Sequence, residues 1–334
     1  MPLVPPRVSP RRLRRLVAGT AAVLGVLGVL LWWLRPFGEP ALTGKLTFST
    51  GVRTGVYHRY GQLLEQALAQ DMPGVKVRLE TSEGSQQNLQ RVASGEADFT
   101  IATADAVAKY RADGKPGAEQ LRGCARLYDD YVQLVVPAGS PVQSARDLRG
   151  KRVAVGQEGS GVRLISDRLL RAAKLDPAHD ITPVAIGIDT MPAELQAGRI
   201  DAFFWSGGLP TNAVRELSER FDIRLVQLGD LVEQLQASGS PARYYRAAVM
   251  PQDAYARARN TSSVATLAVP NLLVTKEGTD ARLTEQFTRT VILSRDRIGH
   301  EVHAAQLVDL RTAIYTDPLD LHQGARRYYR SVKP

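Results

Sequence analysis

Stretches with the pattern of β-strands alternate with stretches with the pattern of α-helices along most of this chain. The alternation begins with a strand at 45–50 and a helix at 57–70, and it restarts with a strand at 151–156 and a helix at 160–175. The helical stretches have apolar residues three and four positions apart, whereas the strands are short apolar runs. Repeated strand–helix units favour parallel strands joined by right-handed crossovers. The sequence therefore predicts an α/β fold built from two similar halves.

We expect the two halves to form two lobes, each with a mixed, mostly parallel sheet flanked by helices. Lobe 1 is predicted to contain residues 45–135 and 270–334, and lobe 2 residues 136–269. The chain would cross from lobe 1 to lobe 2 around 132–136 and return around 268–275. The helical C-terminal residues are then predicted to pack against lobe 1.

An apolar run near the N-terminus, residues 16–34, contains no charged side chain and is long enough to cross a bilayer as a helix. Arginines crowd the arm before it, residues 1–15, and the positive-inside rule places such an arm in the cytoplasm. Residues 35–44 would then link this transmembrane helix to a body on the extracytoplasmic side. The sequence after the run lacks the small-residue pattern of a cleavage site, which favours an uncleaved membrane anchor over a signal peptide. If the segment is cleaved, the body is secreted.

The positive charge of the chain is concentrated near the N-terminus. The net charge is +9, and residues 1–39 contribute six arginines and one glutamate, 6 − 1 = +5, which leaves 9 − 5 = +4 for the rest. A charge this small over so long a body does not indicate nucleic-acid binding.

The motifs of common catalytic and metal-binding classes are missing from the sequence. Ser160 lacks the first glycine of a nucleophile elbow, and residues 149–152 lack the spacing of a phosphate-binding loop. His300 and His303 are three positions apart, unlike the pair on a zinc helix. Cys124, the only cysteine, has no partner for an internal disulfide. We therefore expect no catalytic residue, no metal and no cofactor.

Polar turns that contain glycine or other small residues follow five of the predicted strands. In open α/β sheets, ligands bind beyond the carboxyl ends of the strands, where glycines let backbone amides approach and helix N-termini attract anions. One such turn is usually only a helix cap, but five of them in two lobes predict a ligand cleft. The turns span residues 49–57, 81–88, 103–106, 156–163 and 205–212.

Five sequence blocks occur in the order that is typical of a known receptor family. They are Gly51, Thr54, Gly55 and Tyr57; Thr81, Gly84, Ser85, Asn88 and Leu89 with 95–98; 148–161; 198–204; and 322–329. With these blocks the chain resembles the TAXI family, the solute-binding receptors of tripartite ATP-independent periplasmic (TRAP) transporters. The likeness covers nearly all of residues 45–330.

The resemblance implies a two-lobe fold like that of type II periplasmic binding proteins. It also implies a small carboxylate ligand, either a glutamate-like amino acid or an organic acid, that is delivered to a TRAP-type ion-coupled permease. A receptor that reports to a membrane sensor histidine kinase is one alternative, because it would use the same binding event. An enzyme on the same scaffold is another, although the sequence shows neither a nucleophile nor an acid–base pair for it.

The resemblance also assigns ligand contacts to individual residues. From lobe 1 it implies contacts by Thr54, Gly55, Tyr57, Ser85 and Asn88. From lobe 2 it implies a helix N-terminus that takes a carboxylate, with Ser160, Gly161 and Arg163, and a far wall formed by Gly207 and Gly208. The polar turns add further candidates for the cleft, which are Thr50, Gly51, Arg53, Ser82, Ala104 and Asp105.

Overall fold

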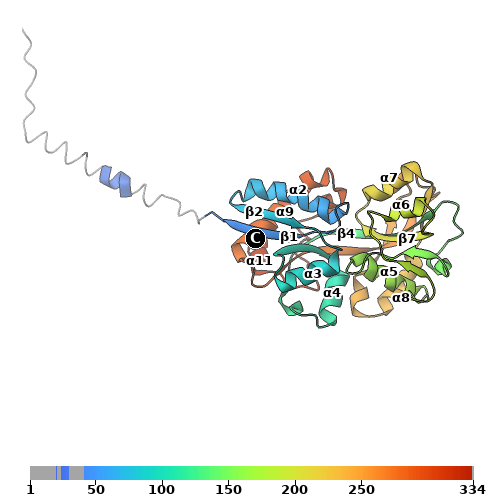
Figure 1. Ribbon diagram of the computed structural model, residues 1–334. Helices are drawn as coiled ribbons and strands as arrows, with labels where there is room; N and C mark the ends of the chain where they lie inside the picture. Colours follow the sequence, from blue (N-terminus) through green and yellow to red (C-terminus); the bar gives the residue numbers. More distant parts are fainter. Residues whose placement is uncertain (1–19, 21–23, 30–40, 333–334) are drawn as a thin grey trace, which may run out of the picture. The chain divides into compact units, whose positions relative to one another are not determined.

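The computed structural model describes residues 20, 24–29 and 41–332. Residues Thr43–Pro334 form one unit, called the body here, and Met1–Leu42 form a separate unit. In Figure 1 the strands of the body run through its interior and helices cover them on both faces.

In the N-terminal unit, the described residues 24–29 are helical. Within the described part of the chain, no helix combines the length and the apolar character needed to cross a bilayer. The predicted arm, 1–15, and most of the predicted membrane segment, 16–34, lie outside the described residues. The membrane anchor therefore stays a prediction.

The strands of the body form a single ten-stranded sheet. The order of its main path is β2-β1-β3-β10-β4-β7-β5-β6, while β8 pairs with β4 and β9 with β10. The strands are β1 (Gly44–Ser49), β2 (Val75–Glu80), β3 (Phe99–Thr103), β4 (Leu121–Pro137), β5 (Arg152–Ala154), β6 (Thr182–Val184), β7 (Ala202–Gly207), β8 (Ile223–Val226), β9 (Arg246–Met250) and β10 (Val264–Lys276).

The two mostly parallel sheets expected from the sequence are thus one mixed sheet. Parallel pairing joins β1 to β2 and β3, and β5 to β6 and β7, whereas the pairs made by β4 and β10 are antiparallel. The reason is the length of β4 and β10, 17 and 13 residues. β10 pairs with β3 of one half and β9 of the other, and β4 pairs with β10 along one stretch and with β7 and β8 along another. We call the half with β1–β3 the β1 side and the half with β5–β9 the β7 side.

The lobe boundaries predicted from the sequence fall inside these two long strands. β10 pairs with β3 through residues 271–274 and with β9 through 264–268. β4 pairs with β7 through 131–135. Because β4 and β10 extend across both sides of the sheet, the division of the body into two lobes stays a prediction. The chain passes from one side of the sheet to the other along these two strands.

Helices surround both sides of the sheet. Figure 1 shows α2, α3, α4, α9 and α11 around the β1 side, and α5, α6, α7 and α8 around the β7 side. The helices are α2 (Val56–Asp71), α3 (Ser85–Ser94), α4 (Ala104–Ala112), α5 (Gly161–Ala172), α6 (Met191–Gln196), α7 (Asn212–Arg220), α8 (Val232–Ala237), α9 (Ala281–Leu293), α10 (Arg295–Gly299) and α11 (Gln323–Val332). Short 3₁₀ helices are η1 (Ala118–Gln120), η2 (Ala145–Leu148), η3 (Gly229–Leu231), η4 (Ser240–Tyr244), η5 (Gln252–Tyr255) and η6 (His303–Leu307).

Local sequence signals account for the ends of several helices. Ser160 precedes α5, and its hydroxyl accepts a hydrogen bond from the Arg163 amide, which is the usual action of an N-cap. Asp280 caps α9 in the same way. Gly95 ends α3 with φ of 85°, a left-handed conformation that glycine adopts without steric cost.

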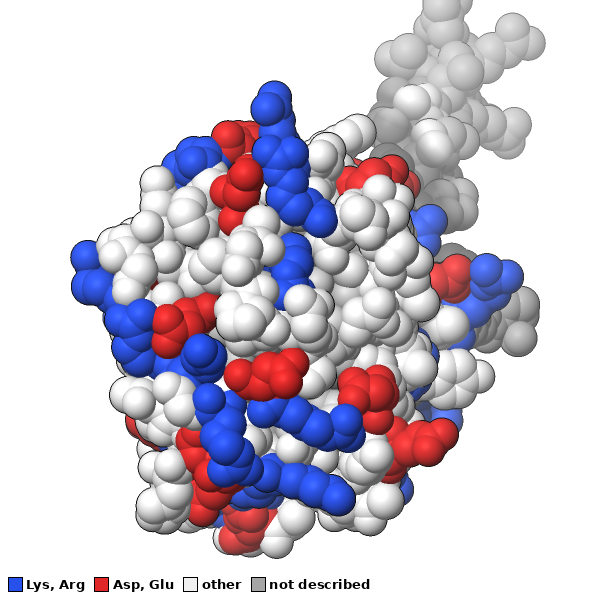
Figure 2. Space-filling view, turned by 90° about the vertical axis from the view of Figure 1, so that its right-hand side faces the viewer, with Lys and Arg blue, Asp and Glu red and all other residues white. Residues whose placement is uncertain are grey.

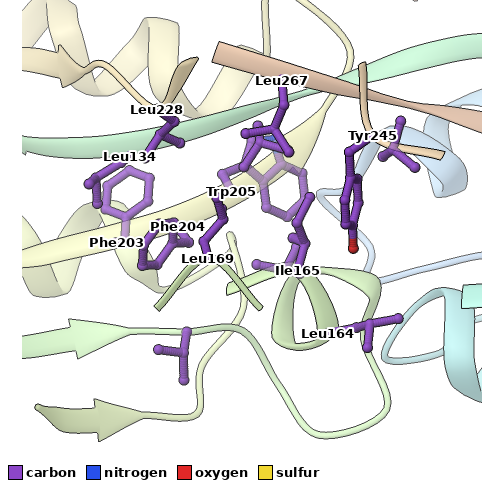
Figure 3. Close-up of a cluster of buried hydrophobic side chains, with 14 of the residues drawn as sticks. Leu134, Leu164, Ile165, Leu169, Phe203, Phe204, Trp205, Leu228, Tyr245 and Leu267 are labelled. Atoms are coloured by element: carbon purple, nitrogen blue, oxygen red, sulfur yellow. The ribbon is translucent and has the colours of Figure 1, made fainter. Parts of the chain in front are cut away.

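Aromatic side chains form much of the core on both sides of the sheet. On the β7 side, Figure 3 shows Phe203, Phe204 and Trp205 of β7 gathered with Ile165 and Leu169 of α5. On the β1 side, the Phe287 ring of α9 stacks on Phe99, with centroids 4.1 Å apart, and on Phe48 at 6.1 Å. The stacking places a C-terminal helix against β1 and β3.

Charged side chains of both signs share the surface of the β7 end of the body. On the face shown in Figure 2, basic and acidic side chains lie next to one another rather than in one continuous basic area. The ion pair between Arg152 and Asp201, at 2.6 Å, belongs to this side of the sheet.

Candidate functional site

A cavity lies in the body where the polar turns from the two sides of the sheet meet. The space open to water within it is about 60 Å³, several times what one water molecule needs. Each of the five predicted turns contributes at least one residue to its lining. Four turns contribute residues that were predicted as ligand contacts, and the fifth, 103–106, contributes Thr103. These predicted residues are Gly51, Gly55, Tyr57, Ser85, Ser160, Gly161 and Gly207.

The N-termini of two helices from opposite sides of the sheet stand at this cavity. Val56 and Tyr57 open α2, Gly161 and Val162 open α5, and all four line the cavity. The first amides of a helix have no acceptor within the helix and carry a partial positive charge. In α5 the cap hydroxyl binds only the third amide, at 3.0 Å. The amides of Gly161 and Val162 are therefore placed to bind an anion.

The turn before α3 and the turn before α5 touch each other across the two sides of the sheet. The amides of Gln86 and Gln87 both donate to the Gly159 carbonyl at 3.0 Å. A Cβ at Gly161 would lie only 3.1 Å from the Ser85 hydroxyl oxygen, so a side chain at this position would press against Ser85. The first amides of α3 are thus already occupied by the protein, unlike those of α5.

A chain of hydrogen-bonded side chains runs along one wall of the cavity. The Tyr57 hydroxyl lies 3.2 Å from the Ser85 hydroxyl and donates to the side-chain carbonyl of Asn271. The Asn271 amide in turn donates to Asp130 Oδ1 at 2.7 Å. Ser206 Oγ is the other donor to Asp130, at 3.5 Å from Oδ2. The network joins α2, β10, β4 and β7.

The position of Asn271 depends on an irregularity in the sheet. The pairing of β10 with β4 shifts register between Pro270 and Leu272, so Asn271 has no direct partner on β4. Such a bulge bends a strand and redirects a side chain, and here it accompanies the contact of Asn271 with Asp130.

Asp130 is the buried charged group of the site, with 3% of its surface exposed. Burial raises the pKa of Asp130 to about 7, the Asn271 hydrogen bond opposes this rise, and the nearby acids Asp129 and Asp105 add to it. Burial also raises the pKa of the Tyr57 hydroxyl well above its usual value, so this phenol stays protonated and donates.

The rest of the lining is apolar apart from a few polar groups. Trp205 donates its indole N–H to the Thr211 hydroxyl at 3.0 Å, which fixes the ring at the cavity. The Thr103 hydroxyl is buried and has no hydrogen-bond partner among the described residues. The apolar residues of the wall are Val52, Val56, Val162, Ile188, Met191 and Trp205.

Comparison with known proteins agrees with this architecture. Residues 48–332 match the model of the NMT1-like family, which is most of the chain. The chain belongs to the NMT1-like family. The narrower resemblance to the TAXI receptors stays a prediction.

Three solved structures share the fold of this NMT1-like chain. One is described as a periplasmic transporter, with a TM-score of 0.54, 13% identity and coverage of 89% of this chain and 94% of that chain. A putative L-cystine ABC transporter from Listeria monocytogenes has a TM-score of 0.51 and 14% identity, covering 80% and 99%. An ancestral arginine-binding protein bound to arginine has a TM-score of 0.51 and 16% identity, covering 78% and 98%. The fold is therefore that of periplasmic binding proteins.

Several residues predicted for the ligand site lie beside the cavity of this NMT1-like chain rather than on it. Thr54 and Gly208 line a neighbouring cavity, together with Gly55. Thr50, Ser82 and Asn88 are buried in a hydrogen-bonded group behind the turns. In this group Ser82 Oγ lies within hydrogen-bond distance of two acceptors, the Thr50 carbonyl at 2.9 Å and Asn88 Oδ1 at 2.7 Å. These three residues hold the turns in place.

The predicted charged residues are also placed outside the lining. Arg53 is exposed. The Arg163 guanidinium pairs with Asp167 at 3.1 Å and with Glu158. Ala104 is fully buried in the first turn of α4. No observation tests ligand contact by any of these residues, or by the buried Asp105 next to Ala104, so the contacts stay predictions.

The sequence analysis missed some of the lining residues for two different reasons. Four of them lie inside the predicted turns, whose sequences therefore already contain the signal for them: Gly84, Gly156, Gln157 and Ser206. Asp130 lies in the middle of β4, a strand that also contains Arg122, Arg126, Asp129 and Gln133, so the local sequence does not distinguish it.

The chemistry available at this site is binding by backbone amides, hydroxyls and one buried carboxylate. Within the described residues, no group of three or more His, Cys, Asp or Glu side chains is placed to hold a metal ion. Cys124 is buried, and its sulfur is not part of the cavity lining.

Proposed function

We propose that this NMT1-like protein is an extracytoplasmic solute-binding receptor without catalytic activity. It captures a small carboxylate, a glutamate-like amino acid or an organic acid, between the β1 side and the β7 side of the sheet. It then delivers the ligand to a TRAP-type ion-coupled permease, and the predicted helix at 16–34 holds the body at the membrane unless it is cleaved.

The observation that carries this proposal is the pair of helix N-termini, of α2 and α5, at one cavity. They approach from opposite sides of the sheet, so a bound ligand contacts both and favours the closed arrangement over an open one. Helix N-termini favour anions, and the Thr103 hydroxyl supplies a further polar contact. The fold shared with proteins described as binding arginine and as transporting cystine supports a small solute as the ligand.

A binding experiment on the full chain tests the receptor role. Native mass spectrometry would identify small molecules that remain bound after purification without refolding. Thermal unfolding would then be followed with a panel of amino acids and organic acids. A ligand present at 100 times its Kd stabilises the folded state by about 2.7 kcal/mol. If no acid of the panel raises the unfolding temperature and none is carried through purification, the receptor proposal is wrong.

A matched pair of glycine variants connects the binding to this cavity. Gly161→Leu places a side chain against Ser85. A Cβ at Gly139 would have no atom within 4 Å, so Gly139→Leu serves as the control. We expect ligand stabilisation to vanish in the first variant and to persist in the second. Persistence in both would place the ligand elsewhere.

The identity of the membrane partner needs a separate test, because one of the similar structures is described as an ABC transporter. In cells that carry the receptor and its neighbouring transport genes, uptake of the identified ligand would be measured after two treatments. Collapse of the ion gradient stops uptake through a TRAP-type permease, whereas depletion of ATP alone stops an ABC transporter. Binding without uptake, together with a kinase response, would favour the sensor alternative.

A further inference from the structure

The cavity contains a buried acidic side chain to which the described residues supply no cation. Glu83 and Asp130 are the charged residues of its lining, which includes no lysine, arginine or histidine. Glu83 is exposed, whereas Asp130 is buried and makes no ion pair within the described residues. Buried charges in proteins are normally paired, so such a carboxyl either holds a proton in the ligand-free protein or takes a cationic partner from outside.

The hydrogen bonds that reach Asp130 leave much of its carboxylate unused. Oδ1 accepts from Asn271 at 2.7 Å, while among the described residues Oδ2 has only Ser206, at the long distance of 3.5 Å. An ionised carboxylate can accept about four hydrogen bonds. Both donors are neutral, so neither brings a positive charge to the carboxylate. A protonated amine would supply a positive charge and up to three N–H donors at once.

The two kinds of charge at the cavity come from different elements. The amides that open α2 and α5 provide partial positive charge, and Asp130 on β4 provides negative charge. A molecule with an acid group and an amino group matches both. A dicarboxylate without an amine would leave Asp130 unpaired or bring a second negative charge near it, which is unfavourable.

We propose that Asp130 recognises a protonated amino group of the ligand, so that the bound solute is an amino acid or another molecule with both an acid and an amine. The proposal rests on the receptor function proposed above and narrows its ligand class. Asn271 positions the Asp130 carboxylate by its hydrogen bond, and Tyr57 positions Asn271. Asp130 is thus a specificity-determining residue in a strand shared by both sides of the sheet.

Paired probes test this proposal on the wild-type full chain. Isothermal titration calorimetry would measure the affinity for each standard amino acid and for the same acid without its amino group, for example L-glutamate and glutarate. We expect at least one amino acid to bind roughly thirtyfold or more tightly than its deaminated partner. Equal affinities within such pairs would overturn the proposal while leaving the receptor function intact. Binding of no acid at all would overturn both.

Two neighbouring aspartates provide the matched variants. Asp130→Asn keeps the shape of the side chain and an acceptor for Asn271 but removes the charge. Asp129→Asn makes the same change next to it, where the carboxylate pairs with Arg126 and Arg246 outside the cavity lining. We expect Asp130→Asn to weaken amino acid binding by roughly thirtyfold or more and to change binding of the deaminated acids little. Asp129→Asn should leave both unchanged.

Circular dichroism would show whether each variant folds. If Asp130→Asn folds and still prefers the amino acids over their deaminated partners by the wild-type ratio, Asp130 is not the recognition group. If it does not fold, the wild-type probe pairs decide the ligand class by themselves, and equal affinities there overturn the proposal.

Discussion

The regions around Asp105 and Asp130 bury the same side chain in opposite ways. Asp105, 1% exposed, accepts from the Tyr245 hydroxyl at 2.6 Å and lies 3.4 Å from the Arg168 guanidinium. Asp130, 3% exposed, has only neutral donors, from Asn271 and Ser206. Within the part of the chain that the structure describes, the first carboxylate has a cation beside it and the second has none.

The difference separates a structural charge from one that is available to a ligand. Asp105 belongs to α4 on the β1 side, whereas Arg168 belongs to α5 on the β7 side, so their pair connects the two sides. Figure 3 shows Tyr245 beside α5, next to the hydrophobic core of the β7 side. Asp130 instead lines the cavity. A buried acid is therefore not a candidate binding residue by burial alone. It becomes one when it lines a cavity and has no cation beside it.

The largest expected effect on the free energy of unfolding comes from replacing Asp105, the paired carboxylate. Asp105→Ala leaves Arg168, whose side chain is 15% exposed, without its partner. Loss of one member of a buried pair costs about 3–5 kcal/mol, and we expect the free energy of unfolding to fall by this order. Urea denaturation would measure it. The double variant Asp105→Asn with Arg168→Met should recover part of this loss. If Asp105→Ala lowers the free energy of unfolding by less than about 1 kcal/mol, the ion pair with Arg168 is not a buried structural pair.

The second prediction concerns the effect of pH on Asp130 in the ligand-free protein. Its pKa is raised from 3.8 to about 7, so the folded state holds this proton more tightly than the unfolded chain. The resulting stability is fully present below about pH 4 and is lost as the pH rises to 7 and above. The nearby acids Asp129 and Asp105 contribute to the raised pKa, and the phenols of Tyr57 and Tyr128 stay neutral.

Asp130→Asn should therefore stabilise the ligand-free protein at pH 8, by up to about 4 kcal/mol for a pKa difference of this size. At pH 4 the variant and the wild type should differ little. Urea denaturation at both pH values checks the sign. A variant that is equally destabilised at both would mean that Asp130 is a structural group like Asp105.

The third prediction compares the hydroxyl groups of two tyrosines, the half-buried Tyr57 near Asp130 and the buried Tyr245 beside Asp105. Tyr57→Phe removes the donor to Asn271, and Tyr245→Phe removes the donor to Asp105. Each leaves a buried acceptor with one donor fewer, and we expect each to lower the free energy of unfolding by about 1–3 kcal/mol. Only Tyr57→Phe should also weaken ligand binding. Calorimetric titration of both variants with the identified ligand checks this difference, and equal effects on affinity would contradict it.

The smallest effect on stability and on ligand affinity is expected at Arg163, which was predicted to contact the ligand. Its charge, like that of Asp105, is already paired with an opposite charge of the protein. Its guanidinium pairs with Glu158 and Asp167, which lie near it in the sequence. Arg163→Gln should lower the free energy of unfolding by less than about 1 kcal/mol, because such ion pairs contribute little. Ligand affinity, measured by titration, should stay the same. A loss of tenfold or more would support the sequence-based prediction that Arg163 binds the carboxylate.

The parts of the fold that depend on neighbouring residues could be predicted from the sequence. The apolar spacing of α2 corresponds to its buried residues Tyr60, Leu63, Leu64, Ala67 and Leu68. The glycine and cap residues before α5 mark its start. The five polar turns also meet at one cavity, because the carboxyl ends of strands and the N-termini of the following helices come together in such sheets.

The sequence by itself determined an α/β chain with polar turns after its strands, since helix periodicity, caps and turns are set by residues close together in the chain. Only the tertiary structure decided that the two sheets are one and that Asp130, rather than Asp105, faces the cavity. These outcomes depend on partners far apart, such as Asp130 with Asn271, 141 positions away, and Tyr57 with Asn271, 214 positions away. Pairing and burial of this kind exist only once the chain has folded, and they determine which charges are neutralised and which are left for a ligand.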